Sequence, residues 1–165
     1  MFEAKKSLRN QNINKTFEAA SKACREIMHN ELMELNICDY IYTPDEAIDE
    51  LGLDEELINQ LLEDYVIQIL KSMSYFYEYL EELKKHKAQN LELEYTPFRE
   101  LAHKNLGVAR NLRIKDAEKL LYVLMKKDDL EYLEVSIKAL KACAIKLKPV
   151  CAYDTLNLMK IKSTF

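Results

Sequence analysis

The sequence predicts an all-α protein, and three observations support this fold class. The 165 residues include only two glycines and three prolines, so few positions suit the tight turns of β-hairpins. Apolar residues recur three and four positions apart along most of the chain, which is the spacing of amphipathic helices. Capping residues and prolines separate these periodic stretches. We expect an antiparallel up-down four-helix bundle with an additional N-terminal helix.

Three segments follow from the periodicity. Residues 1–42 give a polar, frayed start, an amphipathic helix from about residue 13 to residue 37, and a link. Residues 43–148 form the bundle, and residues 149–165 are a C-terminal extension that begins where Pro149 breaks the last bundle helix. The N-terminal helix either packs on the bundle or pairs two copies of the chain in a homodimer.

Helix start and stop signals divide the bundle segment. Residues 43–46, Thr-Pro-Asp-Glu, are a capping box that opens a short helix, which Gly52 ends. Asp54 then caps a long helix to about residue 87, with an apolar stripe that starts at Leu57 and Leu61. Further helices are expected over residues 96–113, 114–127 and 130–147, and Asp128 and Asp129 cap the last of them.

Composition argues against several classes of function. The net charge is -4 and no basic stripe could follow a phosphate backbone, so no nucleic-acid partner is expected. The longest apolar run, residues 120–125, is too short to cross a bilayer and the start lacks a secretion signal, so we expect no membrane contact and a cytoplasmic location. The four cysteines have no CxxC spacing and are interpreted as packing residues. A zinc site of Cys24, His29 and Cys38 is a weaker alternative, and no metal or cofactor is expected in the chain.

Residues 96–112 carry the candidate site. Thr96 and Pro97 are typical of an N-cap and a first helical position. His103 lies well outside the apolar face of this helix and toward solvent, with Arg99, Gly107 and Arg110 on the same side. At 100° per residue, the face expected to be buried holds Phe98, Leu101, Ala102, Asn105, Ala109 and Leu112.

Gly107 is the informative residue of this helix. A glycine inside a periodic helix costs about 1 kcal/mol relative to alanine, so another effect must offset it. The absent side chain, one turn from an exposed imidazole, clears space for another molecule to reach the ring of His103.

The motif resembles that of a known family. Residues 102–112 read Ala-His-Lys-Asn-Leu-Gly-Val-Ala-Arg-Asn-Leu. They resemble the histidine-containing phosphotransfer (HPt) domains of multistep two-component signalling, whose motif is His-x-x-Lys-Gly, then small residues and a leucine, on one helix of an antiparallel four-helix bundle. His103, Gly107 and the positions after it match, and the helix order over residues 43–148 also follows the family. Leu106 stands where the family has its lysine.

The resemblance implies a phosphorelay. His103 would accept a phosphoryl group from a receiver-domain aspartate and pass it on, so the chain would be a phosphocarrier rather than an autonomous enzyme. The implied partners are response-regulator receiver domains and hybrid histidine kinases, and the Mg²⁺ would belong to the receiver. The alternative is a degenerate HPt-fold adaptor that binds receivers or other signalling partners without phosphotransfer.

The resemblance also assigns roles around the histidine. Gly107 and Leu106 would give the partner access to the ring. Arg110, which could reach back over Gly107, would stabilise the phosphate in place of the missing lysine, with Arg99 or Lys104 as further candidates.

Overall fold

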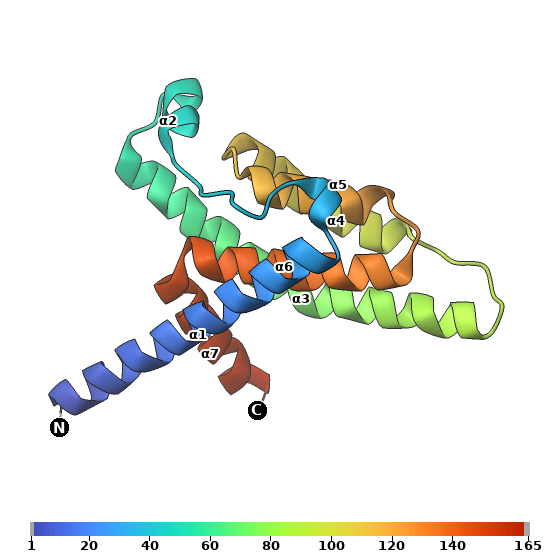
Figure 1. The fold of residues 1–165 in the computed structure, drawn as a ribbon, viewed down its shortest axis with the longest axis horizontal. Helices are drawn as coiled ribbons and strands as arrows, with labels where there is room; N and C mark the ends of the chain where they lie inside the picture. Colours follow the sequence, from blue (N-terminus) through green and yellow to red (C-terminus); the bar gives the residue numbers. More distant parts are fainter. Residues whose placement is uncertain (1, 164–165) are drawn as a thin grey trace.

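The computed structural model describes residues 2–163, in which it has seven α-helices, one short 3₁₀ helix and no strand (Figure 1). The predicted all-α class is therefore confirmed. In chain order the helices are α1 (Phe2–Asn30), η1 (Met33–Leu35), α2 (Asp45–Leu51), α3 (Glu55–Ala88), α4 (Thr96–Asn111), α5 (Lys115–Lys126), α6 (Leu130–Leu147) and α7 (Pro149–Ser163).

Helices α3 to α6 form the centre of a helical bundle. Helix α3 packs on α4 and α6, and α5 packs on the same two helices. Apolar side chains from all four helices meet in one core, where the rings of Phe76 and Phe98 pack edge to face with centroids 5.3 Å apart. This core fixes which face of α4 points inward, and therefore which residues of α4 remain on the surface.

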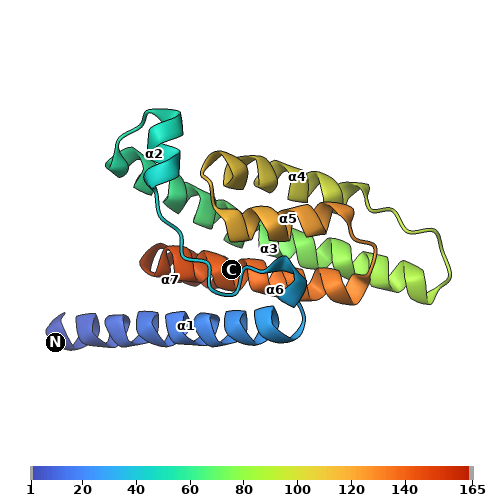
Figure 2. The same cartoon turned by 45° about the horizontal axis from the view of Figure 1, so that its top comes forward.

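Helices α1 and α7 cover one side of this centre (Figures 1 and 2). Helix α1 packs on α6 and α7 and buries Ile13, Ala20, Cys24 and Met28. The expectation of a frayed start is wrong, because α1 is helical from Phe2, although its side chains are exposed as far as residue 11. The C-terminal extension is also ordered as α7, and its last two residues, 164–165, lie outside the described part of the chain.

The link between η1 and α2 is fastened to the connection between α4 and α5. The hydroxyl of Tyr40 donates to the carbonyl oxygen of Arg113 at 3.1 Å and accepts from the amide of Lys115 at 3.1 Å. The hydroxyl of Tyr42 donates to the carbonyl oxygen of Leu112 at 2.8 Å. Desolvation raises the pKa of Tyr42 to about 12, because burial disfavours the phenolate.

Several predicted helix ends are confirmed. Gly52 ends α2 in the left-handed conformation, with φ of 65°. Asp54 caps α3 by accepting from the amide of Leu57, and Asp129 caps α6. The predicted capping box is wrong, because no side chain caps α2 and the helix begins at Asp45.

The predicted core stripe of α3 is confirmed from Tyr65 to Leu83 and is wrong only at its first two residues. Leu57 is 39% exposed and Leu61 is half-buried, whereas their neighbours Ile58 and Leu62 lie in the core.

Within residues 2–163 no helix combines the length and the apolar character needed to span a bilayer.

Candidate functional site

Helix α4 places His103 on the surface. This helix lies along the outer edge of the bundle (Figure 2), and the imidazole of His103 is exposed. The buried residues of α4 are Phe98, Ala102, Asn105, Leu106 and Ala109. Leu101 is only half-buried, so the buried face turns slightly from its predicted centre and takes in Leu106 instead.

Gly107 leaves an open surface one turn after His103. A Cβ atom built on Gly107 would have no heavy atom within 4 Å. The backbone of Gly107 is also helical, since Gly52 is the only glycine of the chain with a positive φ. Neither packing nor backbone conformation within residues 2–163 therefore requires glycine at position 107.

Leu106 lies in the core, and its predicted place on the partner-access surface is wrong. It is 3% exposed because it follows Ala102 by four residues and precedes Ala109 by three, which puts all three on the buried face. A lysine at this position would carry its ammonium into the apolar core. Replacing Leu106 with lysine therefore cannot restore the motif without disturbing the fold.

The two predicted phosphate-stabilising arginines are bound to carboxylates. Arg110 does not reach back over Gly107, because its Nε donates to Oε1 of Glu118 on α5 at 3.2 Å. Arg99 donates from Nη2 to Oδ1 of Asp128 at 2.6 Å, and its guanidinium lies 4.7 Å from the ring centroid of Tyr95. Both arginines lie on α4 near His103 in sequence, but neither points a free guanidinium at it.

Lys104 differs from the two arginines. It is exposed and makes no ion pair among residues 2–163. The exposed surface of α4 thus offers a nucleophilic imidazole, a neighbouring open backbone, one unpaired ammonium and two guanidinium groups held by exposed or half-exposed partners.

A buried amide lies on the opposite side of α4 from His103. Asn105 is fully buried, as predicted, and its Nδ2 donates to the carbonyl oxygen of Leu101 at 2.9 Å and to Oγ of Ser72 on α3 at 3.3 Å. Its Oδ1 has no partner in the described part of the chain. The contact to Ser72 ties the rotation of α4 to α3 and so helps keep His103 outward.

Sequence inspection missed an apolar groove beside Gly107. Val108 is 39% exposed and lines this groove of about 400 Å³ with Leu51, Leu53 and Leu61, which come from α2, α3 and the residues between them. The groove therefore borders the part of α4 that follows Gly107 in the sequence. The spacing of these residues does not mark them as one surface, and Leu61 was predicted to lie in the core stripe of α3.

The weaker zinc hypothesis finds no support in the geometry. Sγ of Cys24 lies 3.7 Å from Sγ of Cys143, whereas Sγ of Cys38 lies 3.2 Å from Nε2 of His29. Cys24 is thus paired with α6 and is not grouped with the other two. In residues 2–163 no three His, Cys, Asp or Glu side chains gather in a way that would hold a metal ion.

No protein-family model, curated protein or solved structure matches the chain. The fold and the site define it as an all-helical protein that displays one histidine on the outer face of a bundle helix. Its function is inferred from this geometry.

Proposed function

We propose that the chain is a histidine phosphotransfer protein of a two-component phosphorelay, acting in the cytoplasm. His103 accepts a phosphoryl group from a receiver-domain aspartate and passes it to a second one. One observation carries this proposal: an exposed imidazole stands one turn from a glycine that no contact within residues 2–163 requires. An imidazole in a closed pocket could not be reached by an aspartate of another protein.

The proposal includes an antiparallel up-down arrangement of α3, α4, α5 and α6. The contacts among these helices close a ring, because each packs on the helix before it and the helix after it, and α6 packs on α3. The connections over residues 112–114 and 127–129 are short, which favours antiparallel neighbours.

The reaction requires only the ring of His103 from this chain as nucleophile. A neutral ring nitrogen attacks the phosphorus of the aspartyl phosphate, a P–N bond forms, and the P–O bond to the aspartate breaks as its carboxylate leaves. The second transfer reverses these bond changes toward another aspartate. The receiver supplies the Mg²⁺, so no cofactor is assigned to this chain.

Cations on α4 neutralise the phosphoryl group. Lys104 is available as it stands, whereas Arg110 must leave Glu118 and Arg99 must leave Asp128. An exposed ion pair is worth about 1 kcal/mol or less, and a guanidinium binds phosphate oxygens in a bidentate way. Arg110 can therefore leave Glu118 and bind the phosphoryl group at a small cost in free energy, and it remains the first candidate.

Labelling by phosphorylated receivers tests the proposal. Purified receiver domains carrying aspartyl phosphate and Mg²⁺ should transfer label to the chain as an acid-labile, base-stable product. His103→Gln should abolish this label, whereas the matched variants His29→Gln and His86→Gln should keep it. Label that persists in His103→Gln would assign the chemistry to another residue and refute the proposal.

A receiver-binding adaptor without phosphotransfer is the second candidate. The observation that favours it is the loss of the cation that the motif places before its glycine: that position is the buried Leu106, and both arginines are held by carboxylates. The adaptor would bind a receiver through α4 and the groove beside Val108. Measurable receiver binding with no label on His103 identifies this function, and loss of binding in Gly107→Leu locates the surface.

The predicted homodimer through the N-terminal helix remains a separate prediction. The apolar face of α1 already packs on α6 and α7 of the same chain. A dimer would therefore have to use the exposed end of α1, where Phe2 and Leu8 are 82% and 57% exposed. Sedimentation of the intact chain and of a Phe2→Ser/Leu8→Ser variant tests it.

A further inference from the structure

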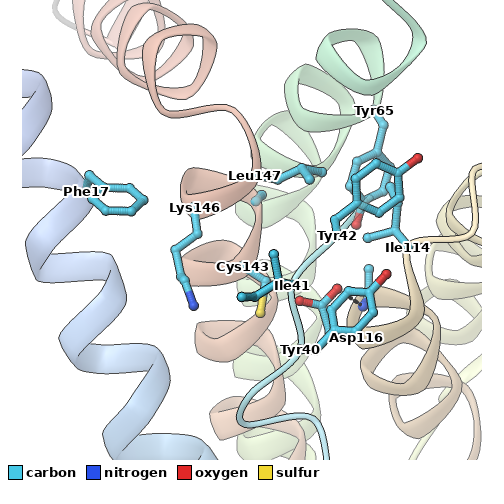
Figure 3. Close-up of a pocket in the computed structure, with 12 residues that line it drawn as sticks. Phe17, Tyr40, Ile41, Tyr42, Tyr65, Ile114, Asp116, Cys143, Lys146 and Leu147 are labelled. Carbon is cyan, nitrogen blue, oxygen red and sulfur yellow. Dashed lines mark hydrogen bonds between the residues drawn. The ribbon is translucent and has the colours of Figure 1, made fainter. Parts of the chain in front are cut away.

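A cavity between the N-terminal helix and the bundle reaches a buried thiol. It has a volume of about 290 Å³ and is lined by residues of α1, the link, α3, α5 and α6. Figure 3 shows Cys143 between the side chains of Lys146 and Asp116. The link forms one wall of the cavity, where Ile41 is 83% exposed, so a small solute can enter from solvent.

Cys143 has a second thiol as its neighbour. Cys24 on α1 and Cys143 on α6 are 4% and 7% exposed, and their sulfur atoms lie 3.7 Å apart. Bonded sulfur atoms lie about 2.05 Å apart, so bond formation requires only a small approach of the two side chains. The other two cysteines have different neighbours: Cys38 contacts His29, and Cys151 contacts the carbonyl oxygen of Glu63.

The surroundings of the pair favour proton transfer. The hydrogen bond with Cys24, burial and the nearby Asp116 raise the pKa of the Cys143 thiol, so its attack on another molecule needs a base. Asp116 lies beside this thiol, and burial raises the pKa of the Asp116 carboxyl. The hydrogen bond from Cys143 and, to a smaller extent, the charge of Lys146 lower the pKa of Cys24 to about 7, against its desolvation. A carboxylate, an ammonium and two thiols thus meet where α1, α5 and α6 come together.

We infer that Cys24 and Cys143 form a reversible disulfide in response to a hydroperoxide that enters through this cavity, and that this bond locks α1 onto α6. The assignment rests on the sulfur–sulfur distance, the open path to Cys143 and the adjacent Asp116. It is independent of His103, which lies on α4.

The chemistry balances with hydrogen peroxide as the oxidant. The Cys143 sulfur attacks one peroxide oxygen while its proton passes to Asp116. The O–O bond breaks, and the hydroxide that leaves takes the proton of Cys24 to form water. The Cys24 sulfur then attacks the sulfenic sulfur of Cys143, and the S–S bond forms as the S–O bond breaks. The departing hydroxide takes the proton from Asp116 as a second water, so two thiols are oxidised and one peroxide is reduced.

The bond would change the attachment of α1. In the dithiol form α1 is held on α6 and α7 by non-covalent contacts such as those of Ala20 and Met28. In the disulfide form it is tied to α6 across 119 residues of chain. Backbone amides of α1 should therefore exchange hydrogen more slowly after oxidation, and addition of dithiothreitol should restore the original rate.

The sharpest test uses the full chain with Cys38→Ser and Cys151→Ser, which keeps only the buried pair. Treatment with hydrogen peroxide, alkylation of free thiols in denaturant and peptide mass spectrometry should identify a linked peptide pair containing residues 24 and 143. The mass should fall by two hydrogens, and dithiothreitol should reverse the change. If both thiols of this variant stay alkylatable, or are oxidised only to sulfinic or sulfonic acids, the inference is wrong.

Single variants separate the roles within the group. Cys24→Ser should leave Cys143 as a sulfenic acid that dimedone traps, with circular dichroism as the check on folding. Asp116→Asn keeps a side-chain acceptor but removes the base, so it should slow disulfide formation at least about tenfold. Asp49→Asn removes an exposed carboxylate on α2 that makes no ion pair within residues 2–163, and it serves as the matched control, with an unchanged rate. An unchanged rate in Asp116→Asn would remove that residue from the mechanism.

Discussion

Replacing Gly107 with alanine should stabilise the isolated protein. The site is exposed, its backbone is helical, and the new methyl group meets no heavy atom within 4 Å. The helix propensity difference therefore acts alone and amounts to about 1 kcal/mol in favour of alanine. For a chain of this size, that gain raises the melting temperature by about 2–4 °C.

Thermal and denaturant unfolding measure this gain. Lys104→Ala is the matched control, because Lys104 is exposed on the same helix and lysine and alanine have similar helix propensities. The midpoint of urea unfolding should rise for Gly107→Ala with an unchanged m-value, and the control should stay near the parent. A destabilised Gly107→Ala protein would mean that the surface at Gly107 is not open, which would refute the clearance argument.

A larger side chain at position 107 should stabilise the protein but slow phosphotransfer. A leucine at position 107 also improves helix propensity, but its side chain would fill the space beside the His103 ring. Phosphotransfer from a receiver should therefore fall in Gly107→Leu while its unfolding midpoint rises. Full transfer activity in a stabilised Gly107→Leu protein would show that the glycine is not there to admit a partner.

Three further predictions concern other groups. Glu118→Gln releases Arg110 from its ion pair, so the initial rate of His103 phosphorylation should rise about twofold to fivefold, as for an exposed pair worth up to about 1 kcal/mol. Asp116 has a raised carboxyl pKa in the folded state, so its stabilising contribution is present in acid and is lost as the pH rises through that value. Asp116→Asn should therefore melt at a higher temperature than the parent at pH 7, and the difference should shrink below about pH 4. Tyr42→Phe removes the hydrogen bond to the carbonyl oxygen of Leu112 and should cost about 1 kcal/mol in urea unfolding, with no change in receiver labelling.

Much of the fold was predictable because helix signals are local. Gly52 and Asp54 act within one turn of their own positions, so the end of α2 and the start of α3 followed from residue type. The outward position of His103 followed from periodicity alone. Periodicity is less precise about the centre of a buried face, so Leu57 and Leu106 were assigned to the wrong side.

The interactions between helices were beyond the sequence pattern. Arg110 and Glu118 lie on different helices, and their contact depends on how α4 and α5 pack, as the contact of Arg99 with Asp128 depends on the turn before α6. The cavity beside Cys143 similarly arises only when α1 and the link close over α5 and α6. Because these residues are far apart in the sequence, their spacing does not indicate that they come together in the fold.

Asn105 and Gly107 of α4 both reduce the stability of the fold, but contacts within the described residues account only for Asn105. Asn105 buries an amide whose Oδ1 has no partner in the described residues, but its Nδ2 donates to Ser72 and to Leu101, so the fold itself gives a reason for it. Gly107 has no such reason, because nothing within residues 2–163 approaches it or requires its backbone freedom. Under the proposed function its cost is offset by contact with a partner protein, and the exposed group that such a partner would reach on the preceding turn is the imidazole of His103.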